Sequence, residues 1–203
     1  MKKKSIIALV CVLALALGSM FGTLAYLTDT ETAANVFTVG KVGITLDEAN
    51  TDKDKVDGAI PERDTSNDYH LIPGQTYPKD PTIHVNADSE DCWLFVKVEN
   101  GIAAIEADTE PEGTTDRYLE IEDQLKANGW NLLPGKTNIY TRTSPASAGD
   151  NIVVFSEFKI DGSGVNNTYL AQYANADITV TAYAIQAAGF ADAASAWTAG
   201  NWK

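Results

Sequence analysis

The chain is poor in the residues on which metal sites, disulfide frameworks and nucleic-acid interfaces depend. Its 203 residues include two cysteines, two histidines and 15 Lys and Arg against 28 Asp and Glu, a formal net charge of −13. Because nucleic-acid affinity comes largely from basic side chains that neutralise phosphates, this balance excludes the common nucleic-acid modules and disfavours docking on anionic lipid. So few Cys and His leave little for a zinc or redox site. The 44% of hydrophobic residues nevertheless indicates a globular protein.

The first 25 residues have the parts of a secretory signal peptide. Three lysines precede a short apolar core from Ile6 to Leu17, and small residues follow it. Thr23 and Ala25 suit the −3 and −1 positions, which predicts cleavage between Ala25 and Tyr26. A retained membrane anchor is the alternative, because the uncharged span from residue 5 to 28 has about the 20 residues needed to cross a bilayer.

Cleavage would remove three lysines and no acidic residue, so the mature chain would carry 12 basic and 28 acidic residues, a net charge of −16. It would also remove Cys11 and leave Cys92 as the single thiol, which fits the exterior of a Gram-positive cell. A domain without disulfides has to be stabilised by its core, and this length permits one. Cys92 begins an apolar run, so we expect it to be buried as a small hydrophobic residue, with an intermolecular disulfide as the alternative.

Period-two patterns and β-branched residues predict strands over most of the mature chain. They occur at residues 42–46, 82–86, 92–99, 138–143, 151–160 and 178–185. In 151–160 we expect one face to carry Ile152, Val154, Phe158 and Ile160, and the other Val153 and Phe155. Turn residues separate these segments, among them Pro73-Gly74, Asn128-Gly129 and Pro134-Gly135. The pattern predicts an all-β fold, an antiparallel sandwich or barrel.

Helix is expected in only two short segments. Residues 115–127 place Tyr118, Ile121 and Leu125 on one face, with Gly129 as the stop signal. Near the C-terminus, Phe190, Ala194 and Trp197 would share a face of a second helix. No repeat or second domain is visible, so the chain is divided into a signal peptide (1–25), an arm (26–40) and a β domain (41–203).

Catalytic motifs are absent, including those of zinc proteases, serine hydrolases and phosphate-binding loops. His70 precedes a turn and His84 lies on the polar face of its strand, where a solvent-facing position is expected. The acidic run at Asp52, Asp54 and Asp57 departs from the EF-hand register, so we expect a solvated loop, with calcium binding as the alternative. No cofactor is predicted.

The segment after the predicted cleavage site is a polar, Thr-rich arm that ends in a short apolar strand. The strand carries Val36, Phe37 and Val39. An arm of this kind ahead of an all-β domain is free to pair with its own sheet edge or with that of a neighbouring molecule.

This region resembles the leader of the TasA/camelysin family of Gram-positive bacteria, whose members are exported through a SipW-type signal peptidase. The matching motifs are LAYLTDTET at 24–32 and NVFTVG at 35–40. Weaker similarity lies in LIPGQTYPKD at 71–80, IHVN at 83–86 and AYAIQA at 182–187.

The resemblance implies a jelly-roll-like β-sandwich, secreted to the extracellular matrix or cell surface, that assembles into biofilm fibres. The arm of one subunit would complete the sheet of the next, with Val36, Phe37 and Val39 as donor-strand anchors. The implied partners are further copies of the chain, sibling matrix proteins and the signal peptidase, with membrane contact only through an uncleaved leader. Some relatives are described as metalloproteases, so a protease is one alternative. A non-polymerising acidic binding module, with Trp197 and Trp202 as contacts, is the other.

Overall fold

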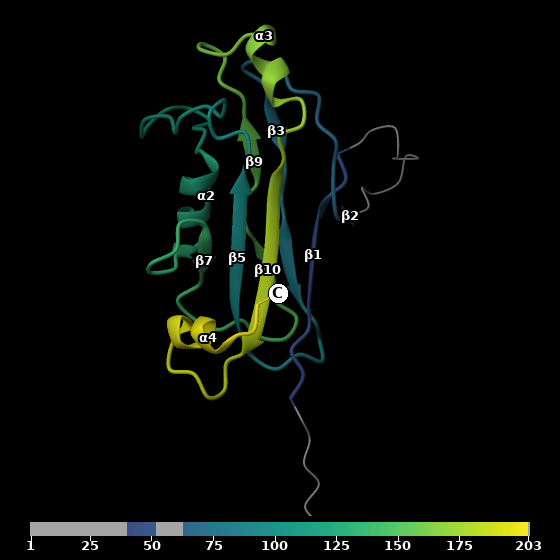
Figure 1. Cartoon of the computed structure of the whole chain (residues 1–203), viewed down its shortest axis with the longest axis vertical. Coiled ribbons are helices and arrows are strands. Elements are labelled where there is room, and N and C mark those ends of the chain that lie inside the picture. Colours follow the sequence, from purple (N-terminus) through teal and green to yellow (C-terminus); the bar gives the residue numbers. More distant parts are fainter. Residues whose placement is uncertain (1–39, 52–62, 203) are drawn as a thin grey trace, which may run out of the picture. The chain divides into compact units, whose positions relative to one another are not determined.

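The computed structural model describes residues 40–51 and 63–202, which belong to the second of its two units, Gly40–Lys203. These residues form mostly antiparallel strands and a few short helices (Figure 1). One sheet has the order β2-β1-β4-β8, with the bounds β1 Ile44–Ala49, β2 Arg63–Asp64, β4 Thr82–Val85 and β8 Asn151–Val153. The prediction of an antiparallel, mainly β fold is thereby confirmed.

The second sheet has the order β10-β5-β7-β6, with the bounds β5 Cys92–Asn100, β6 Asn131–Leu132, β7 Ile139–Thr141 and β10 Ile178–Gln186. A small sheet pairs β3 (Thr76–Pro78) with β9 (Glu157–Lys159). The helical segments are α2 (Ile121–Ala127), α3 (Asn167–Leu170), the 3₁₀ turn η1 (Ala171–Tyr173) and α4 (Ala193–Ala199).

The main hydrophobic core takes side chains from both four-stranded sheets. Ile83 and Val85 of β4 pack in it together with Leu94 and Val96 of β5. Cys92 is fully buried with a free thiol, as predicted for a small hydrophobic residue. Burial is the main cause that raises the pKa of this thiol to about 11, so the reactive thiolate is disfavoured.

Strand β5 is buried on both faces because α4 covers the side opposite the main core. Trp93 and Phe95 pack there against Ala193 and Ala196, in a second cluster. The predicted C-terminal helix is therefore present, but its predicted face is wrong. Ala194 is exposed and Phe190 precedes the helix, because the capping box of Asp192 begins α4 at Ala193.

The helix predicted over 115–127 begins only at Ile121. Tyr118 lies in the preceding loop, where its hydroxyl donates to Glu106 at 2.6 Å and accepts from the Lys159 amide at 3.1 Å. These bonds anchor Tyr118 outside the helix. The stop signal at Gly129 is confirmed, since Gly129 has φ +83° just beyond the C-cap Asn128.

The single strand predicted over 151–160 is wrong, because the chain breaks between β8 and β9. The Gln124 side-chain carbonyl of α2 accepts from the Ser156 and Glu157 amides at 2.9 and 3.3 Å, and it holds the chain in a bend. Phe155 is fully buried in the main core with Val154, so the two are not divided between faces as an unbroken strand requires.

Candidate functional site

The outer edge of β10 has no strand partner in the described part of the chain. β10 pairs along its nine residues with β5 and ends its sheet. At the two ends of this pairing, Gly101 donates to the Asp177 carbonyl and Ala187 donates to the Asp91 carbonyl, at 2.9 and 2.7 Å. Because antiparallel hydrogen bonding alternates, the odd residues of β10 bond to β5. The main-chain groups of the even residues point to the open edge; these are Ile178, Val180, Ala182, Ala184 and Gln186.

β1 offers a second, shorter open edge. The Asn86 amide donates to the Gly43 carbonyl at 2.9 Å, so Gly43 and the odd residues of β1 bond toward β4. The main chains of Ile44 and Leu46 consequently point away from β4. β2 covers this edge only from Glu48 onward, by pairing with Glu48 and Ala49.

The side chains beside these edges are incompletely buried. Ile178, Val180, Ala182 and Ala184 of β10 pack on the main core yet remain partly exposed, and Ile44 and Leu46 of β1 do the same. Their neighbours on β5, by contrast, are almost fully buried. Apolar side chains beside both edges are therefore only partly covered within the described part of the chain.

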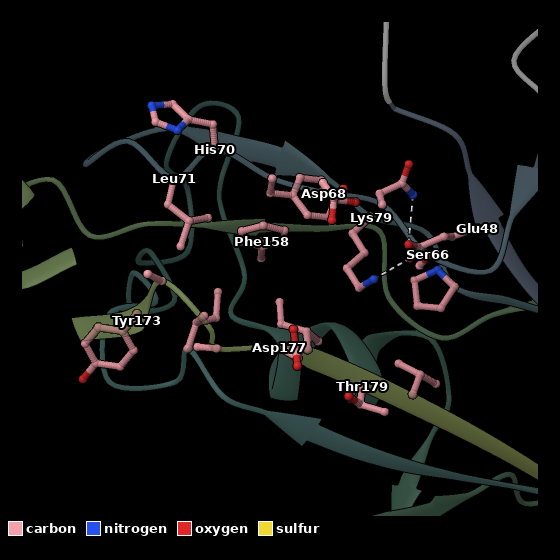
Figure 2. A pocket seen from close by; sticks show the side chains of 18 of the residues that line it. Glu48, Ser66, Asp68, His70, Leu71, Lys79, Phe158, Tyr173, Asp177 and Thr179 are labelled. Atoms are coloured by element: carbon pink, nitrogen blue, oxygen red, sulfur yellow. Dashed lines mark hydrogen bonds and ion pairs between the residues drawn. The ribbon is translucent and has the colours of Figure 1, made fainter. Parts of the chain in front are cut away.

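A cavity of about 1180 Å³ lies between the end of β1 and the beginning of β10, and we call this space the groove. Its walls include Leu46, Glu48, Ile178 and Val180. Figure 2 shows Glu48 and Thr179 among the residues that line it. The volume lies slightly above the roughly 300–1,000 Å³ of small-molecule pockets. β1 and β10 run in opposite directions (Figure 1), so an inserted strand would be antiparallel to one and parallel to the other.

Residues 65–72, which we call the lip loop, form one wall of the groove. Tyr77 anchors this loop, because its hydroxyl donates to the His70 carbonyl and accepts from the Ile72 amide, both at 2.7 Å. The ring of Tyr77 stacks on Phe158 at 5.0 Å, and Tyr69 meets Phe158 edge-on at 5.1 Å. The wall is therefore preformed by aromatic packing and by the hydrogen bonds of the Tyr77 hydroxyl to the main chain of the loop.

The opposite side of the core is closed by α2 and the residues after it. The Trp130 indole donates to the Val153 carbonyl at 3.1 Å, and the side-chain amide of Asn128 donates to the Val154 carbonyl at 3.2 Å. Gln124 adds a bond to the Glu157 carbonyl at 2.8 Å. Side chains thus occupy the main-chain acceptors near β8, whereas nothing in the described residues does so along β10.

The two histidines lie in different places. His70 belongs to the lip loop, whereas His84 of β4 alternates with the buried Ile83 and Val85 and lies on the other face of its sheet. The His84 ring contacts Asn151 through Nδ1 and Asp47 through Nε2, the latter at 3.0 Å, and both nitrogens donate when the ring is protonated. His84 is therefore partnered by side chains rather than simply facing solvent.

We expect the His84 contacts to make stability depend on pH. The Asn151 hydrogen bond and then Asp47 raise the pKa of His84 above 6.5, against burial and Arg63. A histidine whose pKa is raised in the folded state stabilises the fold fully at pH values below its pKa in the unfolded chain, about 6.5. This stabilisation is lost as the pH rises through the pKa of the folded state. Between pH 6 and 9, the free energy of unfolding should therefore fall for the wild type relative to His84→Gln. If urea titrations gave a constant difference in the free energy of unfolding between the two proteins over this pH range, His84 would not be the group responsible.

Several predicted residues lie outside the described residues. They are the cleavage-site residues Thr23, Ala25 and Tyr26, the anchors Val36, Phe37 and Val39, and the acidic residues Asp52, Asp54 and Asp57. Within 40–51 and 63–202, no group of three or more His, Cys, Asp or Glu side chains is arranged to hold a metal ion. No helix in that same part of the chain is long and apolar enough to cross a membrane.

The sequence reasoning did not identify the groove itself. Residues 178–185 were recognised as a strand, but the periodicity of one strand does not reveal which neighbour it lacks. Comparisons of the chain with family models, curated proteins and solved structures gave no match. The resemblance to the TasA/camelysin family therefore depends on the leader and the short motifs quoted above.

Proposed function

We propose that this protein is a secreted structural component of an extracellular or biofilm matrix, and that it assembles into fibres by strand insertion. The apolar end of the arm, with Val36, Phe37 and Val39, would enter the groove of a neighbouring subunit. The two large sheets would then form a jelly-roll-like β-sandwich that is completed only in the fibre.

The open edge of β10 is the observation that supports this proposal most strongly. Exposed sheet edges invite pairing with another chain, and natural proteins usually block them. A nine-residue strand at about 3.3 Å per residue gives an edge of about 30 Å. The 15 residues of the arm, from 26 to 40, are long enough to cover it. Main-chain hydrogen bonds would supply affinity, and alternate side chains would fill the groove.

The way the chain enters the described domain favours a neighbour over the same molecule as the acceptor. Lys41 is still held beside the β4–β5 connection, since its carbonyl accepts from the Glu90 amide at 3.0 Å and its ammonium pairs with Asp88 at 2.6 Å. To insert into its own groove, the chain would have to reverse before Lys41. That reversal would use up residues adjacent to the anchors. Insertion into a second copy needs no reversal, and a head-to-tail contact of this kind can grow into a filament.

The experiment compares the chain from Tyr26 onward with its Phe37→Asp variant by electron microscopy and light scattering. We expect fibres from the wild type above a threshold concentration. The variant should give at least tenfold less pelleted fibre, because a charge would have to be buried against the apolar side chains of the groove. Equal fibre yields would contradict donor-strand insertion. A wild type that stays monomeric would favour the binding module, and chelator-sensitive casein cleavage would favour the metalloprotease.

A further inference from the structure

One wall of the groove holds a lysine, a glutamate and an asparagine in direct hydrogen-bond contact. Glu48 lies near the end of β1, Asn67 lies in the lip loop, and Lys79 directly follows β3. One carboxylate oxygen of Glu48 accepts from the Lys79 ammonium at 2.5 Å, and the other accepts from the Asn67 side-chain amide at 2.9 Å. Figure 2 shows the Glu48 carboxylate beside the Lys79 ammonium.

This group is largely removed from water. The Lys79 side chain is 11% exposed and that of Glu48 is 5% exposed, and the Lys79 ammonium lies 5.9 Å from the centre of the Tyr69 ring. Desolvation makes a buried ion pair a weak source of net stability, since apolar residues of similar volume often serve the fold as well. The three groups are, however, the components of a known kind of chemistry: an amine nucleophile, a carboxyl proton carrier and an amide.

We propose that Lys79 and Asn67 become joined by an intramolecular amide bond, with Glu48 as the proton carrier. Lys79 Nζ attacks Asn67 Cγ, the new Nζ–Cγ bond forms and the Cγ–Nδ2 bond breaks. Nζ gives up two protons, which Glu48 accepts in turn and passes to Nδ2, so the amide nitrogen leaves as an ammonium ion. Glu48 returns to its carboxylate form, and no oxidant, metal or nucleotide is consumed.

The remaining contacts of Asn67 suit the same reaction. The Thr51 amide donates to Asn67 Oδ1 at 2.8 Å, at the atom where negative charge develops when Cγ is attacked. Asn67 Nδ2 also donates to the Ala49 carbonyl at 3.0 Å, which fixes the plane of the side-chain amide. The nitrogen of the nucleophile and that of the leaving group are thus separated by a single carboxyl group in a preorganised site.

The bond would act as a covalent brace on the groove. It would close the segment from Asn67 to Lys79 into a ring and tie the lip loop to the sheet beside β1. Such a ring restricts the unfolded chain, as a disulfide does. The described residues contain no disulfide that could do this, because Cys92 is buried with a free thiol. The brace forms within one molecule, so it does not depend on the proposed assembly into fibres.

Mass spectrometry of the full secreted protein tests this proposal. We expect an intact mass lower by one ammonia than the mature sequence, and a proteolytic digest in which the peptides of Asn67 and Lys79 remain linked. Lys79→Arg and Glu48→Gln should each restore the full mass. The two variants remove the nucleophile and the proton carrier separately, and both leave Asn67 in place.

Two results would overturn the proposal. One is a wild-type protein with the full mass of its sequence after prolonged incubation, a result that needs no variant to fold. The other is loss of ammonia that persists in Lys79→Arg without a linked peptide, because cyclisation of Asn67 onto its own backbone would explain that loss. The thermal midpoint gives a second readout, which should fall in Lys79→Arg because arginine can still pair with Glu48 but cannot form the amide bond.

Discussion

Replacing Ala182 by proline is expected to lower fibre yield about tenfold or more while the domain still folds. The Ala182 amide points to the open edge of β10, so proline removes no hydrogen bond to β5. An inserted strand would lose one donor, worth about 0.5–1.5 kcal/mol, and would also meet the proline ring. Because about 1.4 kcal/mol corresponds to a factor of ten, the combined effect should be easily measured in pelleting assays.

Thr181→Pro is the matched control one residue away. The Thr181 amide points to β5, where Thr181 lies opposite Lys97. Proline there would leave a main-chain acceptor of β5 unpaired, at a cost of about 1–3 kcal/mol in the free energy of unfolding. Urea titration should therefore detect Thr181→Pro and leave Ala182→Pro near the wild type. Equal destabilisation by both substitutions would show that the edge of β10 is not open.

Trp130→Ala is expected to lower the free energy of unfolding by about 3–5 kcal/mol. Trp130 is fully buried between α2 and β6, and its indole closes the side of the core that faces away from the groove. The substitution would leave a cavity and an unpaired Val153 carbonyl. The measurement is the urea midpoint at unchanged slope, which separates lost stability from a change in the surface exposed on unfolding.

Trp130→Phe supplies the control, since it keeps much of the ring volume and removes the indole donor. Its cost should be smaller than that of Trp130→Ala. At protein concentrations and temperatures where both variants are folded, fibre assembly should continue, because Trp130 lies on the closed side. Loss of fibres from a folded Trp130→Phe protein would contradict the division of the molecule into a closed and an open side.

The long strands could be predicted from the sequence because they combine a period-two pattern of apolar residues with many β-branched residues. β5 and β10 were found nearly to their ends, and Gly129 was correctly assigned as the stop of α2. The division of residues 151–160 was missed because it depends on Gln124, which is distant in sequence and supplies the hydrogen bonds at the bend. Because residues on both sides of the bend are apolar, the sequence pattern alone does not reveal where the strand ends.

The groove could not be predicted for a related reason. An open edge is a property of two strands, β1 and β10, that lie more than a hundred residues apart, and of the side on which β5 already pairs. The contact of Glu48 with Asn67 and Lys79 could not be predicted from the sequence either. Glu48 is one of several acidic residues between 47 and 57 and nothing in the sequence distinguishes it, whereas the fold buries it between Lys79 and Asn67.

Amide hydrogen exchange along β10 tests the account most directly. In the Phe37→Asp protein, held unassembled, the amides of Val180, Ala182 and Ala184 should exchange quickly, while those of Thr181 and Tyr183 are protected by β5. In wild-type fibres, the three even amides should slow by about 100-fold or more, as expected for bonds formed with an inserted strand. Even amides that exchange at the same rate in fibres and in the unassembled protein would contradict strand insertion at β10.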